Sequence, residues 1–146
     1  MTYLDTSALI KRFVAEKGSP RVQQIIRRGP VATATIAYAE VFAGLNRKHR
    51  DGDLAKARYA LISRQFESDW QAYIRVELQD EVLQLARTLC ERHPLRGLDA
   101  IHLASALSLK TALGEAMPFA AADARLLRAA EAEDLQPLDV EATPAT

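Results

Sequence analysis

Cysteine and histidine are scarce in this sequence of 146 residues, which holds one cysteine and three histidines. A single thiol forms no disulfide within the chain and no thiolate metal cluster. Cys90 lies in the helical pattern LQLARTLCERH, where we expect a small buried hydrophobic residue rather than a reactive thiol. His49, His93 and His102 are scattered along the chain, so they predict no imidazole metal cluster.

Long apolar runs are also missing. No stretch approaches the roughly 18 residues that a membrane-spanning helix needs. The first residues lack the charged region and apolar stretch of a signal peptide. We therefore expect a cytoplasmic protein without a membrane partner. The length predicts one domain, which we place at residues 1–140, followed by a frayed tail over residues 141–146.

The charge is balanced but unevenly distributed. The formal net charge is zero. Residues 1–128 carry all 19 Lys and Arg against 14 acids, a net charge of +5, and residues 129–146 carry the other five acids. A basic body with an acidic end weakly favours a polyanionic partner. Ordinary solvated helix faces explain the same charges equally well.

Hydrophobic periodicity divides the chain into short strands and longer helices. It predicts helices over residues 7–17, 19–28, 36–50, 53–70, 79–93, 98–114 and 124–134, with Ser19 as an N-cap. It predicts strands over residues 2–4, 31–35, 72–76, 117–122 and 136–140. The helix over 98–114 is apolar around most of its circumference and should be buried. Alternating strands and helices predict an α/β fold with a mainly parallel sheet and helices on both faces.

Four acidic residues stand out by position. Asp5 and Asp123 each follow a predicted strand, and ligands of such folds bind outside the carboxyl ends of the strands. Asp99 lies in the first turn of the apolar helix, and Glu40 lies in the apolar pattern IAYAEVFAGL. Taken singly, the three aspartates fit helix caps or helix N-termini. Glu40 is harder to explain, because a charge in an apolar helix must face solvent or a partner.

Taken together, the four acids point to a metal. Carboxylates that converge on one edge repel each other and raise each other's pKa values. A divalent cation removes that cost, and Mg²⁺ and Mn²⁺ prefer carboxylate oxygens. His102 follows Asp99 by about one helical turn and can orient that carboxylate. A histidine that is satisfied within its helix is the role we favour.

Four segments, LDTSALIKRF, IAYAEVFAGL, LRGLDAIHLASAL and FAAADARLLRAAEAEDL, resemble in order and spacing the motifs of the PIN-domain ribonucleases. The resemblance is specifically to the toxin subunits of VapBC toxin–antitoxin pairs, and it runs from residue 2 to about residue 138. It implies a PIN-like three-layer sandwich with a short sheet of about five parallel strands. It also implies a metal-dependent endoribonuclease that serves as the toxin of a type II toxin–antitoxin system.

The resemblance implies an acidic pocket made by Asp5, Glu40, Asp99 and Asp123. Asp5 and Asp99 match the firmest metal-binding positions of the family, with Glu40 and Asp123 as direct or water-mediated ligands of Mg²⁺ or Mn²⁺. Thr6 matches a supporting position. Hydrolysis would use a metal-activated water and leave a 5′-phosphate and a 3′-hydroxyl on the RNA products.

One position departs from the family pattern. The family often has Thr, Ser or Asn two residues before its last acid, and this chain has Ala121. A polar contact to metal, water or phosphate is then missing, which makes the role of Asp123 the least certain of the four.

Basic residues near the acids are candidate contacts to RNA phosphates. Arg96 and Arg125 stand three residues before Asp99 and two after Asp123, and Lys11, Arg12 and Arg128 are further candidates. Surface solubility explains any one of them equally well.

The resemblance also implies protein partners. Such toxins are usually homodimers and are inhibited by a small antitoxin in a hetero-oligomer. Residues 51–66 alternate apolar and charged faces at helical spacing, and together with residues 7–16 they are a candidate antitoxin groove. Core packing is the stronger expectation for their apolar faces.

Three other functions are distinguished by the residues that each of them requires. A receiver-type signalling domain needs an acid pair near the N-terminus and a late lysine, but Asp5 stands alone and no lysine follows Lys110. An aspartate-nucleophile phosphatase needs a second Asp two residues after the first, where this chain has Ser7. A catalytically idle PIN-like RNA-binding module stays open, because Ala121 replaces a polar residue.

Overall fold

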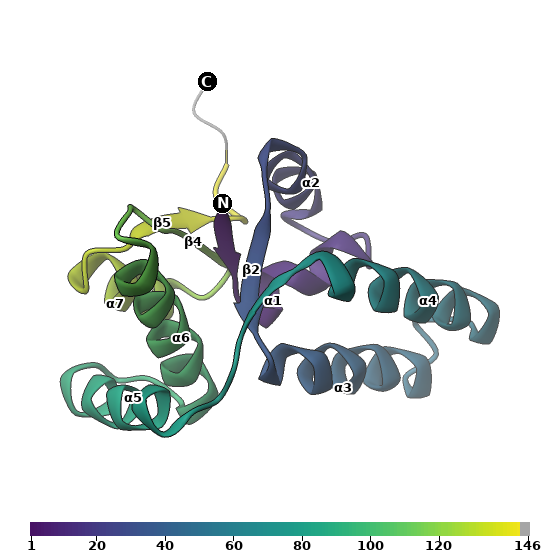
Figure 1. Ribbon diagram of the computed structural model, residues 1–146. Coiled ribbons are helices and arrows are strands. Elements are labelled where there is room, and N and C mark those ends of the chain that lie inside the picture. Colours follow the sequence, from purple (N-terminus) through teal and green to yellow (C-terminus); the bar gives the residue numbers. More distant parts are fainter. Residues whose placement is uncertain (144–146) are drawn as a thin grey trace.

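The centre of the molecule is a sheet of five parallel strands. The computed structural model describes residues 1–143, and the strands lie in the order β3-β2-β1-β4-β5 (Figure 1). All four neighbouring pairs are parallel. The strand bounds are β1 Thr2–Leu4, β2 Val31–Ala34, β3 Ile74–Val76, β4 Pro118–Ala121 and β5 Gln136–Asp139. The predicted α/β sandwich with a short parallel sheet is confirmed.

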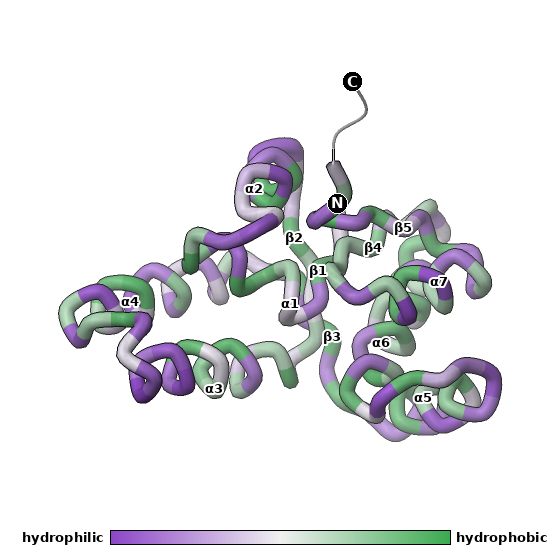
Figure 2. The backbone as a smooth tube through the Cα atoms, turned by 180° about the vertical axis from the view of Figure 1, so that it is seen from behind, coloured by the Kyte–Doolittle hydropathy of each residue, from purple (hydrophilic) through white to green (hydrophobic). Residues whose placement is uncertain are grey.

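Helices cover both faces of this sheet. Their bounds are α1 Thr6–Leu9, α2 Ser19–Arg28, α3 Ile36–Arg50, α4 Lys56–Ala72, α5 Asp80–Arg92, α6 Gly97–Leu113 and α7 Ala124–Ala132, with a short 3₁₀ helix η1 at Ile10–Arg12. Helices α5, α6 and α7 pack on one face, and α1 to α4 pack on the other (Figure 1). Along the helices, green and purple stretches alternate in Figure 2, as expected of elements with one buried side.

Side-chain alternation along the strands divides the core in two. Tyr3 and Phe119 point toward α5, α6 and α7, and their rings stack with centroids 5.3 Å apart. The next residues, Leu4 and Ala120, point toward α1 to α4. Both cores therefore meet at the central strands β1 and β4, whose carboxyl ends become a rigid base for the residues that follow them.

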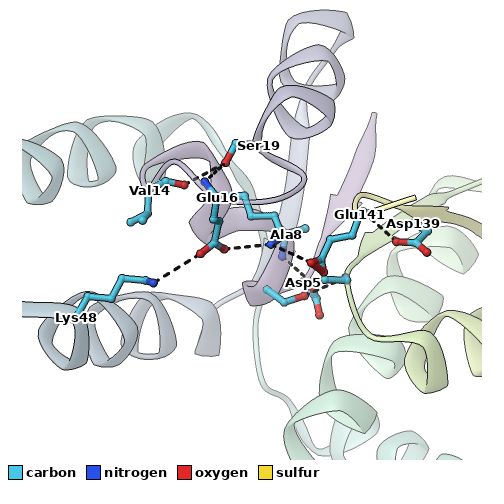
Figure 3. Close-up of polar contacts among 11 residues, drawn as sticks. Asp5, Ala8, Val14, Glu16, Ser19, Lys48, Asp139 and Glu141 are labelled. Atoms are coloured by element: carbon cyan, nitrogen blue, oxygen red, sulfur yellow. Dashed lines mark hydrogen bonds and ion pairs between the residues drawn. The ribbon is translucent and has the colours of Figure 1, made fainter. Parts of the chain in front are cut away.

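The first helical region is shorter than its periodicity predicts. In place of one helix over residues 7–17, α1 and η1 end by residue 12 and the chain reverses into α2. The hydroxyl of Ser19 holds this reversal, because it donates to the carbonyl of Val14 at 3.1 Å and accepts from the N–H of Glu16 at 3.0 Å (Figure 3). Gly18 is the N-cap of α2, so the prediction of Ser19 as N-cap is wrong.

Helix α4 begins at Lys56, three residues later than predicted. The N–H of Asp53 donates to the carbonyl of Lys48 at 2.9 Å, and Nδ1 of His49 lies 2.8 Å from the carbonyl oxygen of Leu54. The side chain of Leu54 is buried at this turn. These contacts hold the segment between α3 and α4 outside either helix.

Two burial predictions need correction. Cys90 is exposed on α5, because the buried face of that helix passes through Val82, Ala86 and Leu89 and position 90 is turned about 100° away from Leu89. Helix α6 is buried over its middle, from Ala100 to Ala106 apart from the half-buried Ile101, whereas its first two residues and its last turn are exposed. Within residues 1–143, no helix is long and apolar enough to cross a membrane.

The segment after β5 is tied to the first helical region. Val140 is buried and donates its N–H to the carbonyl of Ala121 at 3.1 Å. Nζ of the buried Lys11 lies 3.1 Å from Glu16 and 3.9 Å from Glu141. In Figure 3 the carboxylate of Glu16 also faces Lys48, at 3.6 Å. Residues 144–146 of the predicted tail lie outside the described residues, and the domain bounds stay a prediction.

We expect Gly18→Ala to destabilise the fold more than Gly52→Ala. Gly18 has φ +93°, and a Cβ there would lie 2.8 Å from the carbonyl oxygen of Val140. Gly52 has φ +82°, and a Cβ added there would meet no other group within 4 Å. The substitution Gly52→Ala therefore measures only the cost of placing a residue with a Cβ in a left-handed backbone conformation, about 1–2 kcal/mol. Urea denaturation gives both losses in the free energy of unfolding. Equal losses would contradict the close packing of Val140 on Gly18.

Candidate active site

The sheet reverses its direction of growth beside β1. The chain adds β2 and then β3 on one side of β1, and later adds β4 and β5 on the other. Such a switch point opens a crevice at the carboxyl ends of the strands, where ligands of α/β folds bind. Asp5 directly follows β1, and Asp123 follows β4 after one intervening residue.

Asp5 is the most deeply buried acid of the crevice, with 4% of its surface exposed. It is the N-cap of α1, and its Oδ1 accepts from the N–H of Ala8 at 3.0 Å and from the hydroxyl of Ser7 at 2.7 Å (Figure 3). Burial raises the pKa of this carboxyl above its ordinary value, and the Asp99 charge acts in the same direction. The electrostatic interaction with His102 and the two hydrogen bonds oppose that rise without cancelling it. A buried carboxylate of this kind favours a bound positive charge.

Asp99 and Asp123 share one cation of the protein. Nε of Arg96 donates to Oδ2 of Asp99 at 3.0 Å, and Nη2 of Arg96 donates to Oδ2 of Asp123 at 3.4 Å. Asp99 lies in the first turn of α6, and Asp123 caps α7 by accepting from the N–H of Arg125 at 2.8 Å. Hydrogen bonding to Asp99 and the charges of Asp99, Asp123 and Asp5 raise the pKa of the guanidinium.

Glu40 reaches the crevice from α3. Its side chain is 24% exposed. Oε1 accepts from the hydroxyl of Thr6 at 2.6 Å and lies 2.8 Å from Nε2 of His102. Burial alone would raise the pKa of Glu40, but the hydrogen bonds from His102 and Thr6 and the charge of Arg96 outweigh it and hold the pKa below its ordinary value. Glu40 is therefore a carboxylate that the protein keeps ionised.

Three of the four acids line two cavities at the carboxyl edge of the sheet. One of about 330 Å³ is lined by Asp99 and Asp123 together with Arg96 and Arg125. A second of about 490 Å³ is lined by Glu40 and Asp99, again with Arg96. Arg96 and Asp99 belong to both, so Glu40, Asp99 and Asp123 face one region of the surface. Asp5 lines neither cavity, but its charge interacts with those of Asp99 and Arg96.

The donor chemistry of this region fits a hard divalent cation. It offers carboxylate and hydroxyl oxygens, and it holds a buried carboxylate whose negative charge is poorly offset. Among the described residues, no group of three or more His, Cys, Asp or Glu side chains is arranged so that it could hold a metal ion. Arg96 instead supplies the positive charge between two of the aspartates.

The remaining basic candidates differ in their availability. Arg125 is exposed and lines the cavity of Asp99 and Asp123, and Arg128 is exposed on the same helix. Arg12 lies 3.6 Å from Asp69. Lys11 is 6% exposed and paired with two carboxylates, so its charge is not presented to the surface.

His102 contacts a different acid from the one that its helical spacing offers, and the sequence gives no signal for its contact with Tyr3. The ring of His102 contacts Glu40 and not Asp99, although Asp99 is one turn away on the same helix. Nδ1 of His102 lies 2.8 Å from the hydroxyl of Tyr3. These contacts join residues 62 and 99 positions apart, and no local spacing signals them.

Ala121, the departure from the expected motif, is fully buried among the side chains under α5, α6 and α7. A neighbouring hydroxyl serves the turn after β4 instead. Oγ of Ser7 accepts from the N–H of Ala122 at 3.2 Å while donating to Asp5. The turns after β1 and β4 are thereby joined beside the acids.

Comparison with known proteins identifies the family. Residues 2–132 match the PIN domain. This chain belongs to the PIN-domain family. The resemblance noted in the four sequence motifs is confirmed.

Curated proteins named as ribonucleases are similar in sequence to this chain. This PIN domain is 38% identical over 110 residues to Ribonuclease VapC45 of Mycobacterium tuberculosis strain CDC 1551 / Oshkosh, covering 75% of this chain and 76% of that protein. The figures are the same for Ribonuclease VapC49 of Mycobacterium tuberculosis strain ATCC 25618 / H37Rv. Ribonuclease VapC47 of strain CDC 1551 / Oshkosh is 32% identical over 132 residues, covering 87% of this chain and 88% of that one.

Solved structures share the fold of this PIN domain. FitAcB from Neisseria gonorrhoeae matches with a TM-score of 0.68 at 14% identity, covering 96% of this chain and 98% of that one. A toxin–antitoxin complex from Klebsiella pneumoniae matches with a TM-score of 0.62 at 17% identity, covering 84% and 87%. PAE2754 from Pyrobaculum aerophilum matches with a TM-score of 0.62 at 18% identity, covering 97% and 90%.

We expect Asp5→Asn to raise the free energy of unfolding of the metal-free protein at pH 7. Because the pKa of Asp5 is raised, the folded protein binds this proton more tightly than the unfolded chain does. The resulting stabilisation is fully present below the unfolded-state pKa, near 4, and is lost as pH rises through the folded-state pKa. The amide keeps an oxygen for Ser7 and Ala8 without the buried charge. Urea denaturation in EDTA at pH 7 and at pH 3.5 measures this gain, which should shrink at the lower pH. A destabilised variant at pH 7 would contradict it.

Proposed function

We propose that this PIN domain is a metal-dependent endoribonuclease and the toxin of a type II toxin–antitoxin pair. One observation carries the proposal. Glu40, Asp99 and Asp123 line one region at the switch point of the sheet, and the buried carboxylate of Asp5 is close enough to interact with the charge of Asp99. The chain belongs to the PIN-domain family, and its curated relatives are named ribonucleases.

Asp5 and Asp99 are the metal ligands in this proposal, with Glu40 and Asp123 as direct or water-mediated ligands. Mg²⁺ or Mn²⁺ bound there supplies Lewis-acid stabilisation of the phosphate and an activated water. Thr6 supports the site by donating to Glu40. The burial of Asp5 supports its role, because a bound cation offsets the cost of its charge.

The side chain of Arg96 is 79% exposed and contacts both Asp99 and Asp123. In this proposal the guanidinium would contact an RNA phosphate once the two aspartates held a cation in its place. Arg125, on the rim of the same cavity, contacts a neighbouring phosphate. Arg12, and more distantly Lys11, are secondary candidates, because both already pair with acids.

The proposed partner is a small antitoxin, and the proposed assembly is a homodimer of toxin within a hetero-oligomer in the cytoplasm. A groove of about 500 Å³ lies between the first helical region and α4. Arg12, Phe13, Arg58, Leu61 and Arg64 are among its lining residues. This mixture of apolar and basic side chains suits a peptide that carries apolar and acidic residues, and it coincides with the segments expected to form the antitoxin groove.

We expect purified, antitoxin-free protein to cleave structured RNA with Mg²⁺ or Mn²⁺ and not with EDTA. Asp5→Asn and Asp99→Asn should each lower the rate by at least about 100-fold, more than the 10- to 100-fold loss typical of outer-shell changes at metal sites. Asp139→Asn is the matched control, since Asp139 ends β5 at the same edge of the sheet and is exposed. Gel analysis of end-labelled RNA gives the rates.

The outcomes separate the alternatives. Binding of RNA and metal without cleavage, by folded protein and on several RNA pools, would favour the idle RNA-binding module. Cleavage that survives both EDTA and Asp5→Asn would contradict the metal mechanism.

For the antitoxin groove, Leu61→Glu is the sharpest change. Leu61 is 47% exposed, so the substitution costs little in folding but places a charge in the groove. We expect at least about 10-fold weaker binding of the antitoxin, measured by calorimetry. Leu113→Glu, at the exposed end of α6, is the control that should leave binding unchanged. Equal binding by both variants would place the antitoxin elsewhere.

A further inference from the structure

Side chains from two separate elements meet at one oxygen of Glu40. Thr6 at the start of α1 donates to Oε1 at 2.6 Å. His102 on α6 places Nε2 at 2.8 Å from the same oxygen. Behind the ring, the hydroxyl of Tyr3 on β1 lies 2.8 Å from Nδ1 of His102.

The hydrogen bonds of this chain have a defined direction. A carboxylate oxygen only accepts, so Nε2 of His102 must carry the hydrogen that bonds to Glu40. In a neutral ring Nδ1 is then an acceptor, and Tyr3 must donate to it. The carboxylate of Glu40 thus selects this tautomer of the neutral ring, and the hydroxyl of Tyr3 completes the arrangement by donating to Nδ1.

The donors are rigid, whereas the acceptor is at the surface. Tyr3 is 0% exposed and His102 is 2% exposed, and the Tyr3 ring stacks on Phe119. Glu40 lines the cavity of about 490 Å³ that Arg96 and Asp99 also line. Among the described residues, Oε1 makes all the hydrogen bonds of this carboxylate, and Oε2 accepts none.

We infer that His102 is a positioning residue, fixed by Tyr3, that holds Oε1 of Glu40 so that Oε2 is left for a cation bound beside Asp99. The consequence for the cation rests on the proposed function, while the hydrogen-bond direction does not. The plain alternative is that Tyr3 and His102 only satisfy each other in the core. In that case their loss would change stability and leave cation binding unaltered.

The tautomer is tested first, without metal or RNA. Nitrogen NMR of the histidine side chains separates the two tautomers, and His102→Gln assigns the signal among three histidines. We expect hydrogen on Nε2 in EDTA at pH 8, and a shift of that signal in Tyr3→Phe, which keeps the stacked ring. Hydrogen on Nδ1 alone would overturn the inference.

Cation binding is tested next, by calorimetric titration of Mn²⁺ into the folded variants. His102→Leu removes the donor, and we expect about 10- to 100-fold weaker binding, as is typical when an outer-shell partner of a ligand is lost. His102→Gln restores an N–H near the position of Nε2 and should recover most of the affinity. Tyr3→Phe gives a smaller loss and serves if His102→Leu does not fold.

A double-mutant cycle separates positioning from general loosening of the core. In a Glu40→Ala background there is no carboxylate to hold, so His102→Leu should weaken Mn²⁺ binding no further. An undiminished loss in that background would overturn the inference.

The two proposals fail in different ways. If the wild-type protein binds no Mn²⁺, the proposed metal-dependent function fails and the presentation of Oε2 to a cation fails with it. If it binds Mn²⁺ and His102→Leu binds equally well, the function stands and the positioning role is wrong.

Discussion

Repulsion between carboxylates is the constraint on which this structure depends. Four acids lie at one edge of a small sheet, and three different arrangements offset their negative charges. Asp5 accepts hydrogen bonds at the N-cap of α1, Asp99 and Asp123 share Arg96, and Glu40 accepts from Thr6 and His102. The fold therefore concentrates negative charge without completing its neutralisation, which is what a site for a divalent cation requires.

The order of the strands brings the residues of this edge together. Strands β1 and β4 are adjacent only because the sheet grows in two directions from β1. Side-chain alternation along β1 turns Tyr3 toward α6. Asp5 is the first residue after the carboxyl end of the same strand. One short strand thus supplies both Asp5 and the tyrosine that reaches Glu40 through His102, so β1 positions two of the four acids.

The sequence predicted the fold well because its information is local. Periodicity located every strand and helix, and four motifs located Asp5, Glu40, Asp99 and Asp123. Long-range contacts were inaccessible to it. The bond from His102 to Glu40 spans 62 positions, whereas spacing along the helix pointed to Asp99. The early end of α1 depends on Ser19, which bonds back to Val14 and Glu16 from the next helix. The prediction that Cys90 is buried was wrong because it relied on the residue type, whereas its angular position around α5 places it outside the buried face of that helix.

Arg96 is the element of this site that is suited to move. Its guanidinium bonds two aspartates, yet its side chain is 79% exposed, and ion pairs in solvent contribute little net stability. The acids it contacts are better enclosed, with 17% of the Asp99 side chain exposed. A divalent cation carries twice the charge and prefers the same oxygens, so it competes effectively for them. Arginine freed in this way would remain tethered beside the crevice, where its planar donors match a phosphate as well as they match a carboxylate. Under the proposed function, Arg96 would therefore neutralise the acids before a cation binds and contact an RNA phosphate afterwards.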